Sequence, residues 1–120
     1  MAFVDGFVVP VPNKKLKEYR SMAQKAAKVW REHGALEFRE AVADDVKPGK
    51  WTSFPQSVKL EKDETVVFSW IVYKSRAHRD RVMAKVMKDK RLAGMMDLKK
   101  LPFDAKRMIF GGFKVKVSSR

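Results

Sequence analysis

The sequence predicts an α+β fold in which a four-stranded antiparallel sheet carries two helices on one face. Residues 65–74 (TVVFSWIVYK) are rich in β-branched and aromatic side chains on both alternating sides, which is typical of a central strand covered on both faces. One amphipathic helical repeat precedes this strand and another follows it. Three further apolar runs supply the remaining strands, so the expected order is strand, helix, strand, strand, helix, strand.

The first strand and the first helix are predicted from the N-terminal third of the chain. Residues 2–9 (AFVDGFVV) are expected to form a strand that Pro10 and Pro12 end, because proline cannot donate to a central ladder. Asn13 is the expected N-cap of a helix that runs to about His33 and stops at Gly34. The apolar positions of this helix recur at steps of three and four: Leu16, Tyr19, Ala23, Ala26, Ala27 and Trp30.

The middle of the chain predicts an edge strand and a long loop. Residues 35–43 are more polar than the other strands, so they belong at an edge of the sheet. The loop at 44–64 contains Trp51 and Phe54, which indicates that it is pinned down or covers another part of the molecule. A short extended piece is expected at 57–60.

The C-terminal half completes the pattern. Ser75 is the expected N-cap of the second helix, and residues 91–97 are expected to form one more helical turn. Residues 106–117 predict the last strand, in which the pair Gly111 and Gly112 indicates a bulge or a close backbone approach.

This order is the split βαβ, or ferredoxin-like, plan in one domain over residues 1–120. Right-handed crossovers place both helices on one face of the sheet. The first, third and fourth strands are nevertheless apolar on both faces, and an uncovered apolar face of this size is rare in monomers. We therefore expect a second copy of the chain to cover it, giving a homodimer built as a dimeric α+β barrel.

Composition and motifs limit the possible functions. The chain has 27 Lys and Arg against 14 Asp and Glu, a net charge of +13, which favours polyanionic partners. It has no cysteine, which fits a reducing cytoplasm, and no apolar run approaches the roughly 18 residues of a membrane helix. Dinucleotide, P-loop and nucleophile-elbow motifs are absent. His33 and His78 have no further ligands nearby in sequence, so neither a metal site nor a cofactor is expected.

Several long segments resemble the YbaA-like family of small bacterial proteins: VDGFVVPVP, KVWREHGALEFREAVADDV, TSFP, ETVVFSWIVYKSRAHRDRV and PFDAKRMIFGGF. The resemblance covers essentially the whole chain and implies a ferredoxin-like fold of the dimeric α+β barrel superfamily. It supplies no catalytic residues. Members of the wider superfamily bind small aromatic substrates or haem between sheet and helices, which implies a pocket at that place.

Carboxylates on predicted strands are the candidates for such a pocket. A carboxylate in apolar surroundings has a raised pKa and can act as an acid or a base. The alternative is a buried or interfacial ion pair, in which Asp5 or Glu40 meets Arg39 or Arg107. The candidate ligand-binding residues are Asp5, Trp30, Phe38, Glu40, Trp70 and Arg107.

Nucleic acid is the competing partner. The fold plan matches that of an RNA-recognition motif, and residues 110–117 (FGGFKVKV) resemble its aromatic signature, although on the fourth strand instead of the third. A dimer would also bury the sheet face that such a domain offers to bases. The basic residues that RNA could contact on the helices are Lys14, Lys17, Lys25, Lys28, Arg81, Lys85 and Lys88. The preferred interpretation is a small-molecule-binding homodimer, and the sequence does not decide whether it is an enzyme.

Overall fold

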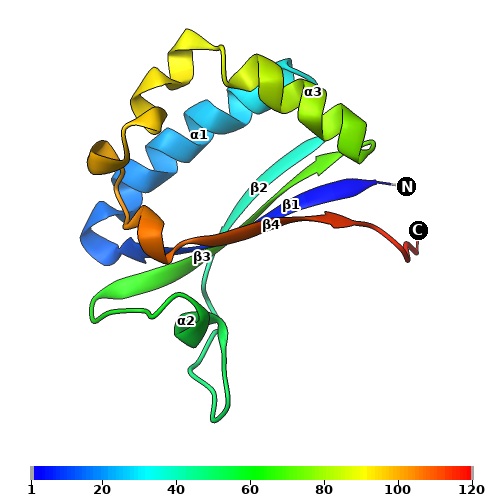
Figure 1. Ribbon diagram of the computed structural model, residues 1–120. Helices are drawn as coiled ribbons and strands as arrows, with labels where there is room; N and C mark the ends of the chain where they lie inside the picture. Colours follow the sequence, from blue (N-terminus) through cyan, green and yellow to red (C-terminus); the bar gives the residue numbers. More distant parts are fainter. Residues whose placement is uncertain (1, 120) are drawn as a thin grey trace.

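A computed structural model describes residues 2–119 of the protein (Figure 1). The strands are β1 (Phe3–Pro12), β2 (Glu37–Val42), β3 (Glu64–Tyr73) and β4 (Ile109–Lys114). The α-helices are α1 (Leu16–Glu32), α2 (Phe54–Ser57) and α3 (Arg76–Val86). The 3-10 turns are η1 (Asn13–Lys15), η2 (Lys90–Met96), η3 (Leu98–Lys100) and η4 (Ala105–Arg107).

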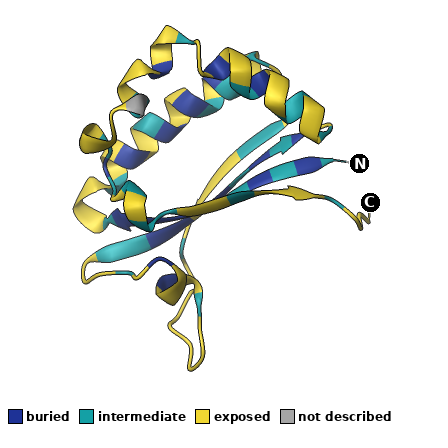
Figure 2. Ribbon diagram, in the orientation of Figure 1, coloured by how far each residue is buried: buried dark blue, intermediate teal, exposed yellow. Residues whose placement is uncertain are grey.

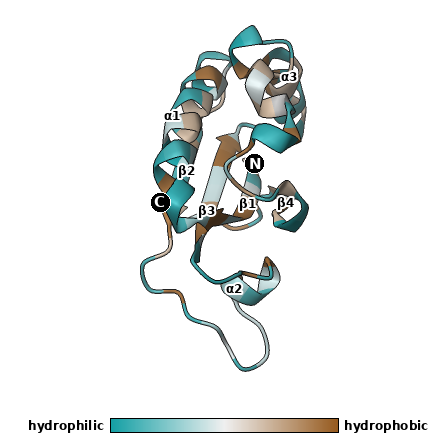
Figure 3. Ribbon diagram, turned by 90° about the vertical axis from the view of Figure 1, so that its left-hand side faces the viewer, coloured by the Kyte–Doolittle hydropathy of each residue, from teal (hydrophilic) through white to brown (hydrophobic). Residues whose placement is uncertain are grey.

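The four strands form one antiparallel sheet in the order β2-β3-β1-β4. Helices α1 and α3 lie on one side of it and the single turn α2 on the other, which the view in Figure 3 shows edge-on. The predicted α+β, ferredoxin-like fold is therefore confirmed. Strand β3 is central, as predicted, and β2 lies at the edge. Asp5 of β1 stands opposite Ile71 on one side and Gly112 on the other, while Glu40 of β2 stands opposite Ser69.

Strand β1 continues through the two prolines that were predicted to end it. Pairing with β4 stops at Val8, whereas pairing with β3 continues to Pro12. The N–H of Asn13 donates to the carbonyl of Asp63, so this position points toward β3. Because backbone groups alternate along a strand, the nitrogens of Pro10 and Pro12 point to the opposite side, where no ladder partner is needed.

Helix α1 starts later than predicted. Residues 13–15 form the turn η1, and no side chain caps the helix that follows, so Asn13 is not its N-cap. Its end agrees with the prediction, because Gly34 has a φ of +116° that favours glycine. The residues that α1 buries are Tyr19, Ala23, Ala26 and Val29.

The loop between β2 and β3 contains the helical turn α2, and residues 58 and 59 follow it as a turn and not as the extended piece predicted at 57–60. The side chain of Ser53 accepts a hydrogen bond from the N–H of Gln56, and Pro55 occupies the first turn. An N-cap and an early proline are the two local signals that start a helix, and they decide the conformation here.

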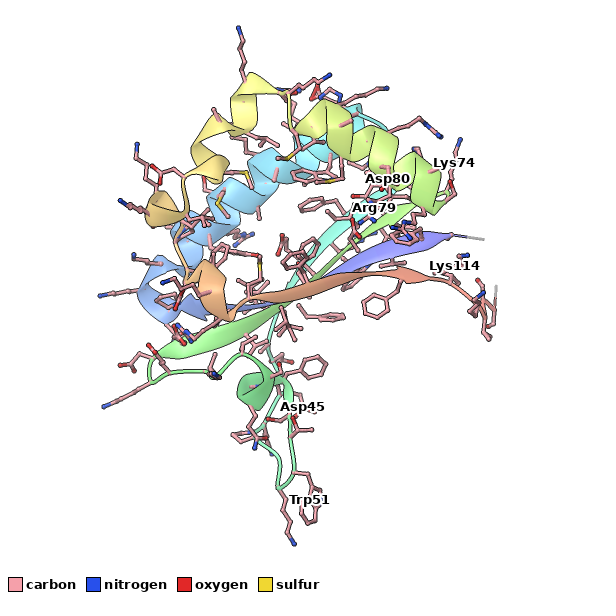
Figure 4. The ribbon with its side chains drawn as sticks, viewed as in Figure 1. Asp45, Trp51, Lys74, Arg79, Asp80 and Lys114 are labelled. Atoms are coloured by element: carbon pink, nitrogen blue, oxygen red, sulfur yellow. The ribbon has the colours of Figure 1, made fainter. Side chains whose placement is uncertain are left out.

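This loop covers one end of the sheet face opposite α1 and α3. Val58 is buried against Val8 and Val66, and the ring of Phe54 contacts that of Phe68 at 5.8 Å between centroids. The rest of the loop projects away from the sheet, and Trp51 lies at its tip with 86% of its surface exposed (Figure 4).

The remainder of that face stays open and apolar. A hollow of about 670 Å³ lies on it, walled by Val4, Phe68, Trp70, Ile109 and Phe113 among others. Phe113 is 65% exposed and Ile109 44% exposed, whereas β1 and β3 are largely buried (Figure 2). The loop at 44–63 therefore shields only part of the face, and its cover by a second chain stays a prediction.

After α3 the chain returns to the sheet through the turns η2, η3 and η4. The predicted helical turn at 91–97 is the 3-10 segment η2, which buries Leu92 against α1, α3 and β3. Within residues 2–119, no helix is both long enough and apolar enough to cross a membrane.

Candidate functional site

A cavity of about 420 Å³ lies between the sheet and the helical layer, and we call it the central cavity. Strands β1, β2 and β3 form its floor, α1 and α3 its roof, and the segment from η2 to β4 closes its side. Its aromatic walls are Phe7, Tyr19, Trp30, Phe38, Phe103 and Phe110. Its methionines are Met22, Met83, Met95 and Met108. Among these apolar side chains lie two carboxylates, Asp5 and Glu40.

Asp5 is held by a chain of buried hydrogen bonds. Its Oδ1 accepts from Nη1 of Arg79 at 2.8 Å, and Figure 4 shows Arg79 reaching from α3 toward the strands. The hydroxyl of Tyr73 also donates to this carboxylate and in turn accepts from Nε1 of Trp30 at 3.2 Å. The guanidinium lies 4.8 Å from the ring centre of Phe3. Contacts with α3 and β3 thus hold the Asp5 side chain in one position.

Burial and charge act in opposite directions on this group. Burial raises the pKa of Asp5 above its ordinary value, and the positive charge of Arg79 offsets part of that rise. Burial and the neighbouring Asp5 carboxylate raise the pKa of the Tyr73 hydroxyl, so it remains a donor. No buried side-chain nitrogen or oxygen in residues 2–119 lacks a hydrogen-bond partner. What sets Asp5 apart is that its charge is matched within the chain by Arg79.

Gly112 makes room for this network. A Cβ atom at Gly112 would lie 2.6 Å from Cζ of Phe3 and 3.1 Å from Oδ1 of Asp5. The close backbone approach predicted for the two glycines is therefore found at Gly112. No bulge accompanies it, since Gly111 and Gly112 keep regular register with Gly6 and Asp5.

Glu40 has no basic partner among the residues described. Its Oε1 accepts from the hydroxyl of Tyr19 at 2.7 Å, and Ser69 donates a second hydrogen bond. Glu40 is an exposed residue of the edge strand β2, but its carboxylate lines the cavity, where loss of hydration raises its pKa and the two neutral donors only partly oppose the effect. A carboxyl group of this kind can bind or release a proton closer to neutral pH than an exposed glutamate, or accept a hydrogen bond from a ligand.

The two carboxylates are separate sites. Asp5 and Glu40 lie two strands apart and two residues out of register, which places their Cα atoms about 12 Å apart by ordinary strand spacings. They cannot share a proton as a close carboxylate pair does. No group of three or more His, Asp or Glu side chains within residues 2–119 is arranged to hold a metal ion.

The structure brings four of the six predicted pocket residues together. Asp5, Trp30, Phe38 and Glu40 all line the central cavity. Trp70 does not, because Ser69 and Ile71 point toward the helices and the alternation of β3 turns Trp70 to the opposite face. There its Nε1 donates to Oε1 of Glu37 at 2.9 Å.

Arg107 is also absent from the cavity. Its Nη1 and Nη2 donate to the two carboxylate oxygens of Glu64 at 2.8 and 2.7 Å, and its Nε donates to Asp104 at 3.1 Å. This two-pronged pair fastens η4 to the start of β3. Asp5 does form a buried ion pair, as the alternative interpretation expected, but with Arg79 and not with Arg39 or Arg107. Arg39 pairs instead with Glu37 at the surface.

Sequence reasoning missed Arg79 as the partner of Asp5. The sequence did indicate that Arg79 faces inward, because it lies one helical turn before Val82 and Met83 and so shares their face of the helix. Tyr19 and Tyr73 were assigned to the core without regard to their hydroxyls. Each sits opposite a strand carboxylate, which is where a buried hydroxyl finds a partner.

The predicted nucleic-acid residues fall into two groups. Lys14, Lys17 and Lys25 line a hollow of about 690 Å³ between α1 and the segment η2–η3, together with Arg91 and Lys100. The other members, Lys28, Arg81, Lys85 and Lys88, are exposed on the outer sides of α1 and α3 and just beyond α3. Nucleic-acid binding by either group stays a prediction.

Comparison with known proteins places the chain in a family. Residues 2–105 match a family model described as a protein of unknown function, DUF1428. The chain is 50% identical over 114 residues to the uncharacterised protein YbaA of Escherichia coli strain K12, covering 95% of this chain and 96% of that protein. A YbaA sequence from Shigella flexneri matches equally. The protein belongs to the DUF1428 family. The predicted YbaA-like resemblance is thereby confirmed.

Solved structures support the DUF1428 fold assigned above. A dimeric ferredoxin-like protein from an uncultured marine organism superposes with a TM-score of 0.56 at 13% identity, over 100% of this chain and 99% of that one. The designed protein Foldit4 superposes with a TM-score of 0.51 at 9% identity, over 97% of this chain and 100% of that one. At these identities the likeness concerns the fold alone.

Proposed function

We propose that this DUF1428 protein binds a small, largely apolar molecule in the central cavity. The observation that carries the proposal is a cavity of about 420 Å³, walled by aromatic and methionine side chains, with few polar groups. Binding sites for small molecules are typically apolar concavities of about 300–1,000 Å³ with a few convergent polar groups. Methionine walls also adapt to the shape of a ligand at low cost.

Glu40 is the polar group that would orient the ligand. Its only partners within residues 2–119 are the hydroxyls of Tyr19 and Ser69, which leaves acceptor capacity on the carboxylate. A hydroxyl or amine on the ligand is the matching donor. Asp5 is occupied by Arg79 and Tyr73 and serves to fix the wall behind Trp30.

The experiment is a fluorescence titration with N-phenyl-1-naphthylamine, a neutral aromatic probe that emits strongly in apolar surroundings. We expect saturable binding with one probe per chain. Ala26 is buried on the cavity side of α1, so Ala26→Leu adds three carbons to the space the probe needs and should weaken binding. Ala27→Leu, one position along the same helix and outside the cavity lining, is the matched control.

The titration can either support or overturn the proposed binding. Urea unfolding of both variants establishes that each is folded before affinities are compared. Absence of saturable binding, or equal weakening by Ala26→Leu and Ala27→Leu, would overturn the proposal. The proposed function is binding alone, without a named substrate or reaction.

We also propose that two copies pair through the open sheet face. The hollow lined by Phe68, Trp70 and Phe113 supports this, because large exposed apolar patches on soluble proteins mark interaction sites. The marine ferredoxin-like protein that shares the fold is described as dimeric. The loop carrying Trp51 projects on the same side, beside the face that a second copy would cover.

A further inference from the structure

The central cavity has a basic neighbour on its outer side. The hollow between α1 and the segment η2–η3, about 690 Å³, is lined by Lys14, Lys17, Lys25, Arg91 and Lys100, and we call it the basic hollow. Met22, Met95 and Leu101 line both this hollow and the central cavity. These three apolar side chains therefore form part of the wall between the two spaces.

The charges of the basic hollow are largely uncommitted. None of the ion pairs found in residues 2–119 involves Lys14, Lys17 or Lys25. Two of the five basic side chains are already paired, Arg91 with Glu32 and Asp89, and Lys100 with Asp97 at 4.0 Å. The single carboxylate in the lining is Glu18, so the hollow is strongly positive. A positively charged concavity concentrates anions.

The opposite flank of α1 is less positive, because Glu40 lies there beside Lys17 and Arg20. The central cavity extends there to Glu40, whose carboxylate is hydrogen-bonded but not neutralised by a basic group of the described chain. At the α3 side, the charge of Asp5 is matched by Arg79. The lining of the basic hollow has five basic side chains and one carboxylate, whereas the groove at Glu40 has two basic side chains and one carboxylate, so an anionic group would be favoured in the basic hollow. This difference in charge would favour one orientation of a charged ligand in the site.

The geometry points to an amphipathic anion as the ligand: we infer that its apolar body fills the central cavity and its carboxylate, sulfonate or phosphate lies in the basic hollow. Met22, Met95 and Leu101 would line the passage between the two parts. This inference rests on the proposed function, since it assigns a ligand class to the same cavity. It gives Lys17 and Lys25 a role in ligand recognition.

A matched pair of probes tests it. N-phenyl-1-naphthylamine and 8-anilinonaphthalene-1-sulfonate share one aromatic skeleton, and the second adds an anionic sulfonate. We expect the sulfonate to bind roughly five- to tenfold more tightly at low salt, as two exposed ammonium groups of ordinary strength would give. High salt should reduce this preference because it screens exposed charges.

Two double variants locate the effect. Lys17→Gln with Lys25→Gln should abolish the preference while leaving the neutral probe's affinity unchanged. Lys85→Gln with Lys88→Gln removes the same charge outside the lining of both spaces and should leave the preference intact. Equal loss in both double variants would mean a general charge effect and would overturn the inference.

The remaining outcomes separate the two proposals. Equal affinity of both probes, with the neutral probe still weakened by Ala26→Leu, would overturn the inference and leave the proposed function standing. Failure of both probes to bind would overturn both. Salt-sensitive binding of tRNA that only the Lys17 and Lys25 variant abolishes, without any sulfonate preference, would assign the hollow to nucleic acid and also overturn the inference.

Discussion

Oδ1 of Asp5 and Nη1 of Arg79 lie 2.8 Å apart although 74 positions separate them in the chain. The contact joins the first strand to α3 across one end of the central cavity. Both side chains are largely shielded from solvent, with 11% and 23% of their surfaces exposed. The pair therefore acts as a structural clamp, and its loss should be felt in stability before it is felt in binding.

Arg79→Met should lower the free energy of unfolding by about 3 kcal/mol. The substitution keeps the stem of the side chain but leaves Asp5 with a buried, unpaired charge, and breaking a buried pair on one side costs this much. Adding Asp5→Asn to the same chain removes the charge and should restore much of the loss. Urea unfolding monitored by circular dichroism measures both.

Arg81→Met is the control for this pair, since Arg81 is exposed on the same helix. It should change stability by no more than about 0.5 kcal/mol. A double variant no more stable than Arg79→Met alone would show that the buried charge is not the cause.

Gly112→Ala should destabilise the protein by about 1–3 kcal/mol, the usual cost of overpacking. The added Cβ would lie 2.6 and 2.8 Å from ring carbons of Phe3 and must displace the ring or the strand. Gly111→Ala is the matched change one residue earlier, where the nearest atom is a ring carbon of Phe113 at 3.6 Å. Thermal unfolding of the two variants should differ clearly, and equal melting temperatures would contradict the steric account.

Glu64 and Arg107 should make stability sensitive to acid. The hydrogen bonds from Arg107 lower the pKa of Glu64 below its ordinary value of 4.5, so the stabilisation is present above that pH and is lost as pH falls through the folded-state value. Glu64→Gln should cost about 2 kcal/mol at neutral pH, the scale of hydrogen bonds to charged groups.

The same variant should also lose part of its acid sensitivity below pH 4.5. Denaturant titrations across this pH range measure how steeply the free energy of unfolding changes with pH. Asp45→Asn removes an exposed carboxylate of the long loop and should leave stability at neutral pH unchanged. If the free energy of unfolding changed with pH equally in Glu64→Gln and in the parent protein, Glu64 would not be a source of the acid sensitivity.

Phe113→Lys should convert a dimer into a monomer. Phe113 is 65% exposed on the open sheet face, and two lysines facing each other across a two-fold axis would repel. Met87→Lys places the same charge on an exposed apolar residue just after α3 and should leave the assembly intact. Sedimentation velocity measures the mass, and a parent protein that sediments as a monomer of 13.9 kDa would refute the pairing.

The arrangement of the strands could be predicted because it depends on local patterns. The two-sided apolar run at 65–74 predicted the central position of β3, and the polar run at 35–43 predicted an edge. The prolines of β1 misled the prediction because their effect depends on which side of the strand carries a partner. That side is set by where β4 begins, which depends on a distant part of the chain.

The site was predictable only in part, for the same reason. Asp5, Phe38 and Glu40 follow from strand alternation, and Trp30 from the helical stripe. Trp70 was grouped with them because it is aromatic, although alternation turns it away from Ile71. Asp5 pairs with Arg79 and not with Arg107 because α3 crosses over the sheet at this point. The local sequence pattern does not reveal where α3 crosses.

The four methionines in the wall of the central cavity have a chemical consequence. Oxidation of a thioether to its sulfoxide places a polar group in an apolar wall, and dedicated reductases reverse it. Met22 and Met95 also border the basic hollow, so oxidation of either would alter the wall that the two spaces share. The ligand binding proposed for the central cavity should therefore be lost after mild treatment with peroxide and restored by enzymatic reduction of the methionines.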